Sequence, residues 1–210
     1  MSISGSQTYT RRDGVCLCDW DDDARNDYAR LVSDPRVMAF ISDGKPRSFE
    51  QAASEVDTFN LELQARGWSR WAVRREATGA FLGYSGFAQK EYGINFGQRF
   101  FPKLWRSRAP IAAAHLALEY GFLKLGFDQI HTLTNLNHTM AIRLNRNYLG
   151  VDDSYGVVCD TPFGPHLRID VTRAMFLSGL QRNRQRIFAH AVGAAGQDAP
   201  PAISPPVTLA

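Results

Sequence analysis

Long apolar runs are missing from this sequence, and with them the signals that would place it in or across a membrane. No stretch reaches the roughly 20 apolar residues that a membrane-spanning helix needs. The opening residues, MSISGSQTYT, contain no apolar core, so no secretory signal is expected there. We therefore predict a cytoplasmic protein with no membrane partner.

Cysteine is scarce as well, which excludes a disulfide-stabilised scaffold. The chain has three, Cys16, Cys18 and Cys159, and the spacing of the first two is not the C-x-x-C of zinc or redox sites. Reduced, buried thiols are expected instead. Asp21, Asp22 and Asp23 could together form a metal site, but capping of a helix explains them better. No metal is predicted.

The excess of positive charge is small, a formal +3 over 210 residues. By itself it does not indicate nucleic-acid binding. The residues that could contact a nucleic-acid backbone are Arg182, Arg184 and Arg186. A solvated helix face is the commoner explanation of such a run. The 44% hydrophobic content suits one compact domain over residues 1–190, followed by a disordered Ala- and Pro-rich tail over residues 191–210.

Hydrophobic periodicity and capping residues predict an α+β fold. A twisted, mixed and mostly antiparallel sheet should carry helices on both faces, and the helix between strands 92–101 and 130–134 should make those two strands parallel. Ser48 and Gln51 form a capping box, and Gly67 closes the helix that they open. The other strands are predicted at 8–19, 71–74, 81–87, 157–159 and 167–171, and the helices from Asp22 to about Ser33 and at 49–66, 110–125, 138–148 and 173–188.

One stretch, residues 96–125, organises the rest of the chain. A strand ends at Pro102, and Pro110 suits the first turn of a helix, where its missing N–H costs nothing. The loop between them should aim free backbone N–H groups at one point beside the positive end of the helix dipole, which predicts an anion site, most plausibly for phosphate. Arg106 and Arg108 add charge there, and Trp105 is expected to anchor the loop in the core.

The order of these elements and several local phrases resemble the GNAT acetyltransferases, in particular the RimJ/RimL type of N-acetyltransferase. The resemblance covers about residues 8–177. It rests on the order and spacing of the phrases rather than on any one of them. The matching phrases are Asp34-Pro35-Arg36-Val37-Met38, Thr78-Gly79-Ala80-Phe81-Leu82-Gly83-Tyr84, Phe101-Pro102-Lys103-Leu104-Trp105, Tyr120-Gly121-Phe122, Leu125-Gly126-Phe127, Asn137 and Leu149-Gly150-Val151.

The resemblance implies an acetyl-CoA donor whose pantetheine arm lies in a V-shaped gap between strands 92–101 and 130–134. Backbone groups at the end of the first strand would bind the arm, and Asn137 resembles the asparagine that contacts it. The pyrophosphate would lie on the loop and helix N-terminus described above. The cofactor-binding residues expected on this basis are Phe100, Phe101, Arg106, Ser107, Arg108, Ala109, Pro110 and Asn137.

The sequence departs from the family pattern in that loop. Arg106 and Arg108 stand where the family usually has two glycines, and Pro110 stands where it has a small residue. Glycine lets a backbone close around a pyrophosphate without side-chain bulk. The two arginines could grip the phosphates through their guanidinium groups, which we favour, or they could block the cradle.

The acid–base residues are a second departure. The family often places a Ser or Tyr after the asparagine, where this chain has Met140 or Ala141, so Tyr148 is the candidate proton donor, with core packing as the alternative. Glu91 is the candidate base, although a solvated loop carboxylate is the commoner role for such a residue. His131 is a more distant candidate base.

These features predict an N-acyltransferase that moves an acetyl group to a primary amine, on a protein N-terminus, a small molecule or a nucleobase. The alternatives are a degenerate GNAT-fold binding module without acetyl-CoA activity, or a transferase that uses a different acyl donor. Dimers are common in the family that the chain resembles, so a homodimer is a further expectation.

Overall fold

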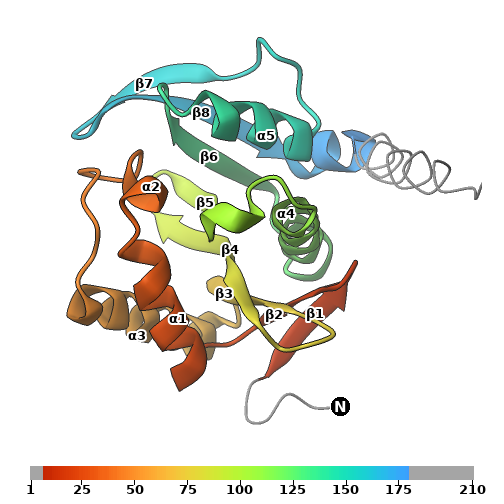
Figure 1. Ribbon diagram of the computed structural model, residues 1–210. Helices are drawn as coiled ribbons and strands as arrows, with labels where there is room; N and C mark the ends of the chain where they lie inside the picture. The colour runs from red at the N-terminus through yellow and green to blue at the C-terminus, as the bar shows by residue number, and fades with distance from the viewer. Residues whose placement is uncertain (1–6, 180–210) are drawn as a thin grey trace, which may run out of the picture.

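A computed structural model describes residues 7–179 and shows one eight-stranded sheet with the strand order β1-β2-β3-β4-β5-β6-β8-β7 (Figure 1). Every neighbouring pair is antiparallel except β5 and β6, which are parallel as predicted. The strands are β1 (Thr8–Arg12), β2 (Val15–Cys18), β3 (Arg70–Arg75), β4 (Phe81–Lys90), β5 (Gly93–Phe100), β6 (Gln129–Asn135), β7 (Val157–Thr161) and β8 (Gly164–Thr172).

The helices lie on both faces of this sheet. Phe59 of α3 packs against Tyr84 of β4 on one face, and α1 packs beside α3. On the other face α4 covers β2 and β4, and α5 lies next to it against β6 and β8. The helices are α1 (Asp22–Val32), α2 (Pro35–Met38), α3 (Phe49–Arg66), the 3-10 turn η1 (Pro102–Leu104), α4 (Ala109–Glu119), the π-helical η2 (Tyr120–Lys124) and α5 (Thr139–Leu149).

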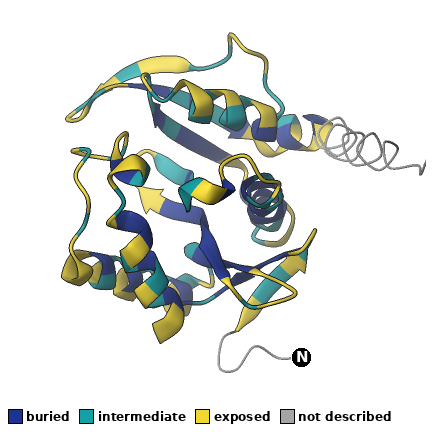
Figure 2. Cartoon of the chain, viewed as in Figure 1, coloured by how far each residue is buried: buried dark blue, intermediate teal, exposed yellow. Residues whose placement is uncertain are grey.

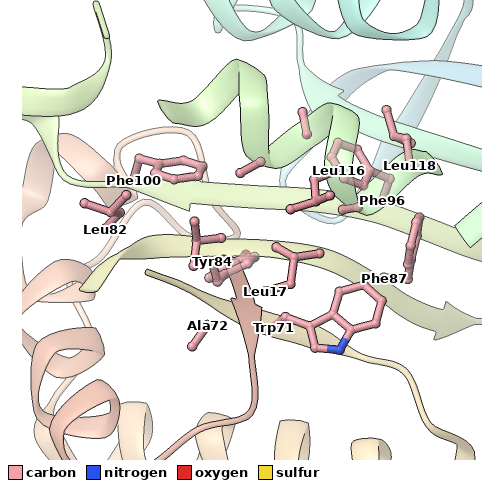
Figure 3. Close-up of a cluster of buried hydrophobic side chains, with 14 of the residues drawn as sticks. Leu17, Trp71, Ala72, Leu82, Tyr84, Phe87, Phe96, Phe100, Leu116 and Leu118 are labelled. Atoms are coloured by element: carbon pink, nitrogen blue, oxygen red, sulfur yellow. The ribbon is translucent and has the colours of Figure 1, made fainter. Parts of the chain in front are cut away.

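The central core lies between β5 and α4. Phe96 lies beside Leu116 and Leu118 of α4, and Phe100 lies at the other end of β5 near Leu82 (Figure 3). All five side chains are buried, and burying an aromatic or leucine side chain stabilises a fold by about 1.5–3 kcal/mol. This packing fixes α4 relative to β5, and the anion site is expected between the end of the strand and the start of the helix.

The predicted helix caps are confirmed. The Asp21 carboxylate accepts a hydrogen bond of 2.8 Å from the Ala24 amide at the start of α1. The capping box of Ser48 and Gln51 opens α3, and Gly67 ends it in the left-handed conformation with φ of 77°. Such caps satisfy backbone groups that a helix end leaves without partners.

The single first strand predicted for residues 8–19 is wrong. The chain turns at Asp13 and Gly14, whose φ angles are 55° and 77°, and β1 and β2 pair with each other as a hairpin. Two successive residues with positive φ make the turn that joins short antiparallel strands, and Asp-Gly is a sequence that favours it. The remaining strands and helices lie close to their predicted positions.

The end of the domain is described only in part. Residues 173–179 are helical, and the rest of the helix predicted to residue 188 lies outside the described residues. The predicted tail over residues 191–210 and the arginine run from Arg182 to Arg186 lie outside them too.

Two further observations concern residues 7–179 alone. Their helices are too short or too polar for any of them to span a bilayer. Their His, Cys, Asp and Glu side chains do not gather into a group of three or more that could hold a metal ion.

Candidate functional site

The parallel strands β5 and β6 are joined at one point and then diverge. Their register contains a single pair, Asn95 with His131, in the part of the chain that the structure describes. β5 is a central strand between two layers of helices, yet six of its eight residues are only half-buried (Figure 2). The strands are therefore not paired between this point and Phe100, at the C-terminal end of β5, and we call the space between their unpaired backbones the gap.

The backbone of β5 presents hydrogen-bonding groups to this gap. The Phe101 amide donates to the Leu82 carbonyl of β4 at 3.4 Å. Because backbone groups of successive residues in a strand point to opposite sides, the groups of Gln98 and Phe100 point away from β4 and into the gap. The Phe100 carbonyl already accepts a bond of 2.9 Å from the Trp105 indole. The amides of Gln98 and Phe100 are left as donors on this edge.

Phe101 differs from Phe100 in this respect. Its amide is directed to β4, and its carbonyl accepts a hydrogen bond of 2.8 Å from the Leu104 amide. Both backbone groups of Phe101 are thus engaged within the protein. The structure brings Phe101 to the edge of the gap without offering its backbone to a ligand.

The N-terminus of α4 comes shortly after the end of β5. Pro110 occupies its first turn, as predicted, and the hydroxyl of Ser107 accepts a hydrogen bond of 3.3 Å from the Ala109 amide. Within residues 7–179 the structure gives no protein partner to the amides of Arg108 and Ile111. These donors lie at the positive end of the helix dipole, where an anion is stabilised.

Both arginines of this loop are exposed. Neither Arg106 nor Arg108 forms an ion pair or side-chain hydrogen bond with another described residue. Their charges are therefore available to a ligand. Trp105 is exposed too, at 49%, so the prediction that it anchors the loop in the core is wrong. Its indole N–H instead donates a hydrogen bond to the Phe100 carbonyl.

Asn137 lies at the same edge of the sheet, because the C-terminal ends of parallel strands share one edge. Its side chain is exposed in the loop before α5, and its backbone N–H donates to the Asn135 side-chain oxygen at 2.9 Å. The next residue, His138, packs its ring on Phe40 with the centroids 4.5 Å apart. This contact joins the segment after α2 to the β6–α5 loop.

Tyr148 lies on the α4–α5 side of the gap. Its side chain is 2% exposed, and its hydroxyl accepts a hydrogen bond of 3.2 Å from the Gln98 amide group. Burial raises the pKa of Tyr148, which keeps the hydroxyl protonated. The Gln98 side-chain oxygen is buried and has no partner among the described residues. Sequence reasoning misses Gln98 as a site residue, because its contact with Tyr148 spans 50 positions of sequence.

The two candidate bases both lie near the start of β5, and the His131 ring is 5.4 Å from that of Tyr92, the residue after Glu91. Glu91 is exposed in the turn before β5, at the end of that strand opposite to Phe100, so the structure does not bring it to the open end of the gap. His131 is 2% exposed and lies where the strands part. Its Nε2 is buried and lacks a hydrogen-bond partner within residues 7–179. Burial and the neighbouring Arg168 lower the pKa of His131 and favour its neutral form.

Comparisons with known proteins show the family to which the chain belongs. Residues 15–147 match the family model described as "Acetyltransferase (GNAT) domain". The chain is similar to an uncharacterised N-acetyltransferase of Bacillus subtilis, YoaA, with 28% identity over 127 residues that cover 59% of this chain and 71% of that protein.

Solved structures share the fold at low sequence identity. An acetyltransferase of the GNAT family from Bacillus anthracis superposes with a TM-score of 0.67 and 16% identity, covering 80% of this chain and 99% of that one. A spermidine N-acetyltransferase SpeG chimera from Vibrio cholerae and hSSAT gives a TM-score of 0.59 and 14% identity over 79% and 99% of the two chains. With the family model covering more than half of its length, this chain belongs to the GNAT acetyltransferase family.

Proposed function

We propose that this protein is an N-acetyltransferase that moves an acetyl group from acetyl-CoA to a primary amine, and that it is closest in kind to the RimJ/RimL enzymes. The observation that carries the proposal is the gap between β5 and β6, which opens beside the N-terminus of α4. It supports the proposal because the β5 amides facing the gap would suit an acyl carbonyl, and the amides at the start of α4 would suit a phosphate.

The residues present fit acetyl-CoA. The α4 amides and the exposed guanidinium groups of Arg106 and Arg108 would hold the pyrophosphate. The Gln98 side-chain oxygen lacks a partner within residues 7–179. It would accept a hydrogen bond from an amide N–H of the pantetheine arm, and this bond would offset the free-energy cost of burying the oxygen without a partner. Asn137 at the same edge would contact the arm from the β6 side.

Bound acetyl-CoA would supply an acetyl group activated as a thioester. The Gln98 and Phe100 amides would donate to its carbonyl oxygen and stabilise the negative charge that develops there. The incoming amine forms the bond to the acetyl carbon while the carbon–sulfur bond breaks. The Tyr148 hydroxyl, kept protonated by burial, would give its proton to the leaving sulfur.

A base must take the proton that the amine loses. His131 is the better placed of the two candidates, because it lies where the strands part and is kept neutral by its surroundings. We propose that it acts through a water molecule. Glu91 lies near the same end of β5, but its side chain is exposed in the turn before the strand.

Turnover tests this proposal directly. The purified protein is incubated with acetyl-CoA and a panel of primary amines, including spermidine and short peptides, and release of the free CoA thiol is followed. We expect amine-dependent release and an acetylated product by mass spectrometry. A protein that binds acetyl-CoA and transfers nothing would favour the binding module, and activity with only another acyl-CoA would favour the alternative donor.

A further inference from the structure

The face of the sheet opposite α4 carries a group of aromatic and cationic side chains that the proposed chemistry leaves unused. Tyr84 of β4 is 3% exposed, and two guanidinium groups lie against its ring. The Arg70 group is 5.2 Å and the Arg99 group 5.4 Å from the ring centroid. We call Arg70, Tyr84 and Arg99 the arginine–tyrosine cluster.

The cluster borders the gap. The guanidinium of Arg70 donates to the Tyr84 hydroxyl at 3.4 Å and to the Asn95 side-chain oxygen at 3.2 Å. Asn95 pairs with His131 at the point where β5 and β6 diverge. The cluster thus lies beside the closed end of the gap, where the two strands are joined. It is on the sheet face that an amine would approach if the pantetheine arm lies against Gln98 and Tyr148.

Gly97 makes room for the Arg70 guanidinium. A Cβ atom at this position would lie 2.4 Å from Arg70 Nη1, far inside van der Waals contact. The backbone of Gly97 is not in the left-handed region, and the atoms that a Cβ would meet belong to the mobile end of the Arg70 side chain, so the glycine affects where the guanidinium lies rather than the backbone conformation. The strand therefore has glycine where a cation rests on it.

The charges in and around the cluster do not cancel. Arg99 lies 3.7 Å from the Glu55 carboxylate and donates to the Tyr28 hydroxyl at 3.1 Å. Glu55 is shared with Arg47, whose Nε lies 3.8 Å from it and which also pairs with Asp43 at 3.0 Å. Arg70 has no ion pair with a carboxylate anywhere in residues 7–179. Arg99 Nε is buried without a hydrogen-bond partner in the same range. One positive charge on this face is left without a counter-ion among the described residues.

We infer that the acceptor is an amine that also carries a carboxylate, and that Arg70 binds this carboxylate beside the gap. The inference rests on the proposed function and adds the substrate class. A guanidinium has five N–H donors, and the two hydrogen bonds of Arg70 to Tyr84 and Asn95 leave others that would bind the oxygens of a carboxylate. A cationic acceptor such as a diamine would meet an uncompensated positive charge at the same place.

Three acceptors of almost equal length test this inference: δ-aminovalerate, its carboxamide, and cadaverine, which end in a negative, a neutral and a positive group. Initial rates with acetyl-CoA give kcat/KM for each. We expect the carboxylate to be preferred over the carboxamide by about tenfold or more, and cadaverine to be the poorest. No preference, or a preference for cadaverine, would overturn the inference while leaving the transferase in place.

Variants test whether Arg70 is the residue that causes the preference for a carboxylate. Arg70→Gln should abolish it, so that the carboxylate and the carboxamide react with similar kcat/KM. Gly97→Ala keeps the charge but should push the guanidinium aside, so it should lower the preference as well. Arg75→Gln, at the exposed end of the same strand, is the matched control and should change nothing. A preference that survives Arg70→Gln contradicts the inference.

Binding separates a failed acceptor class from a failed transferase. If none of the three amines is acetylated, saturation-transfer NMR in the presence of CoA measures binding of δ-aminovalerate alone. Binding to the wild type that is lost in Arg70→Gln supports the inference even without turnover. Equal binding to both proteins, or no binding to either, contradicts it.

Discussion

Asn95 and His131 form the one register pair between β5 and β6 in the described residues, and the site depends on the divergence of the two strands beyond this pair. The described parts of these strands share no further bridge there, while β5 continues to pair with β4 up to Phe100. Backbone donors that a closed sheet would consume are thereby left facing a gap. The same pair joins the gap to the opposite sheet face, through the contact of Asn95 with Arg70.

Removal of the charges at the start of α4 should weaken binding of the diphosphate. In the double variant Arg106→Ala/Arg108→Ala we expect the Kd for acetyl-CoA to rise about tenfold, since these exposed groups are partly screened by solvent. Isothermal titration calorimetry measures the change. Binding of pantetheine, which lacks the diphosphate, should stay unaltered, and Arg75→Ala is the control for net charge. Tighter binding of acetyl-CoA in the double variant would show that the arginines obstruct the cradle.

Tyr148→Phe removes the proposed proton donor. We expect kcat to fall about a hundredfold, with KM for acetyl-CoA little changed, because the hydroxyl acts on the leaving sulfur. The lost hydrogen bond with Gln98 should lower the free energy of unfolding by about 1 kcal/mol. Tyr155→Phe, which removes a hydroxyl bonded to the Asp170 carbonyl at 3.0 Å, is the matched control. A Tyr148→Phe enzyme that turns over within about twofold of the wild type would leave Tyr148 as a core residue.

Asp21 has a structural role that can be measured separately. Its carboxylate caps α1 and pairs with Arg74, which is 5% exposed. Asp21→Ala should lower the free energy of unfolding by about 3 kcal/mol, because it removes a cap and leaves a buried cation unpaired. Asp22→Ala, at the exposed neighbouring position, should cost less than about 1 kcal/mol. Equal effects in urea unfolding would contradict this role of Asp21.

His131 should make the stability of the fold depend on pH. Its pKa in the folded state is lowered by burial and by Arg168, whereas in the unfolded chain it is about 6.5. The unfolded state therefore binds more protons between these two values, and stability falls as the pH drops below about 6.5. His131→Gln removes the titrating ring, so the slope of unfolding free energy against pH should decrease by up to about 1.4 kcal/mol per pH unit.

Two measurements check this dependence. Urea unfolding of the wild type and His131→Gln at about pH 7 and about pH 5.5 gives the difference in slope. His138, whose pKa burial also lowers, contributes to both proteins equally and so cancels. An NMR titration of the His131 ring with a midpoint at or above about 6.5 would contradict the account.

The order of elements can be predicted from the sequence because the signals are local. Pro110, the capping box of Ser48 and Gln51, and Gly67 each act within a few residues, and all lie at their predicted places in the structure. The turn at Asp13 and Gly14 is also a local signal, although the predicted strand runs through it. An Asp-Gly pair between two short apolar runs is enough to identify the hairpin.

The site itself depends on contacts between distant positions. The pairing of Gln98 with Tyr148 and of Arg70 with Asn95 joins residues that no periodicity relates. Glu91 is a candidate base because it comes just before β5 in the sequence. The two ends of this strand lie far apart, and Glu91 is at the end opposite to Phe100. The contact of Gly97 with the Arg70 guanidinium involves a side chain on β3, so it can be seen only in three dimensions.

The central claim is that the gap between β5 and β6 and the N-terminus of α4 bind acetyl-CoA. A calorimetric titration of the full chain with acetyl-CoA tests it most directly. We predict saturable binding of one molecule per chain, and a midpoint of thermal unfolding that rises with the ligand concentration as mass action requires. Absence of both heat and stabilisation at millimolar acetyl-CoA would contradict the account.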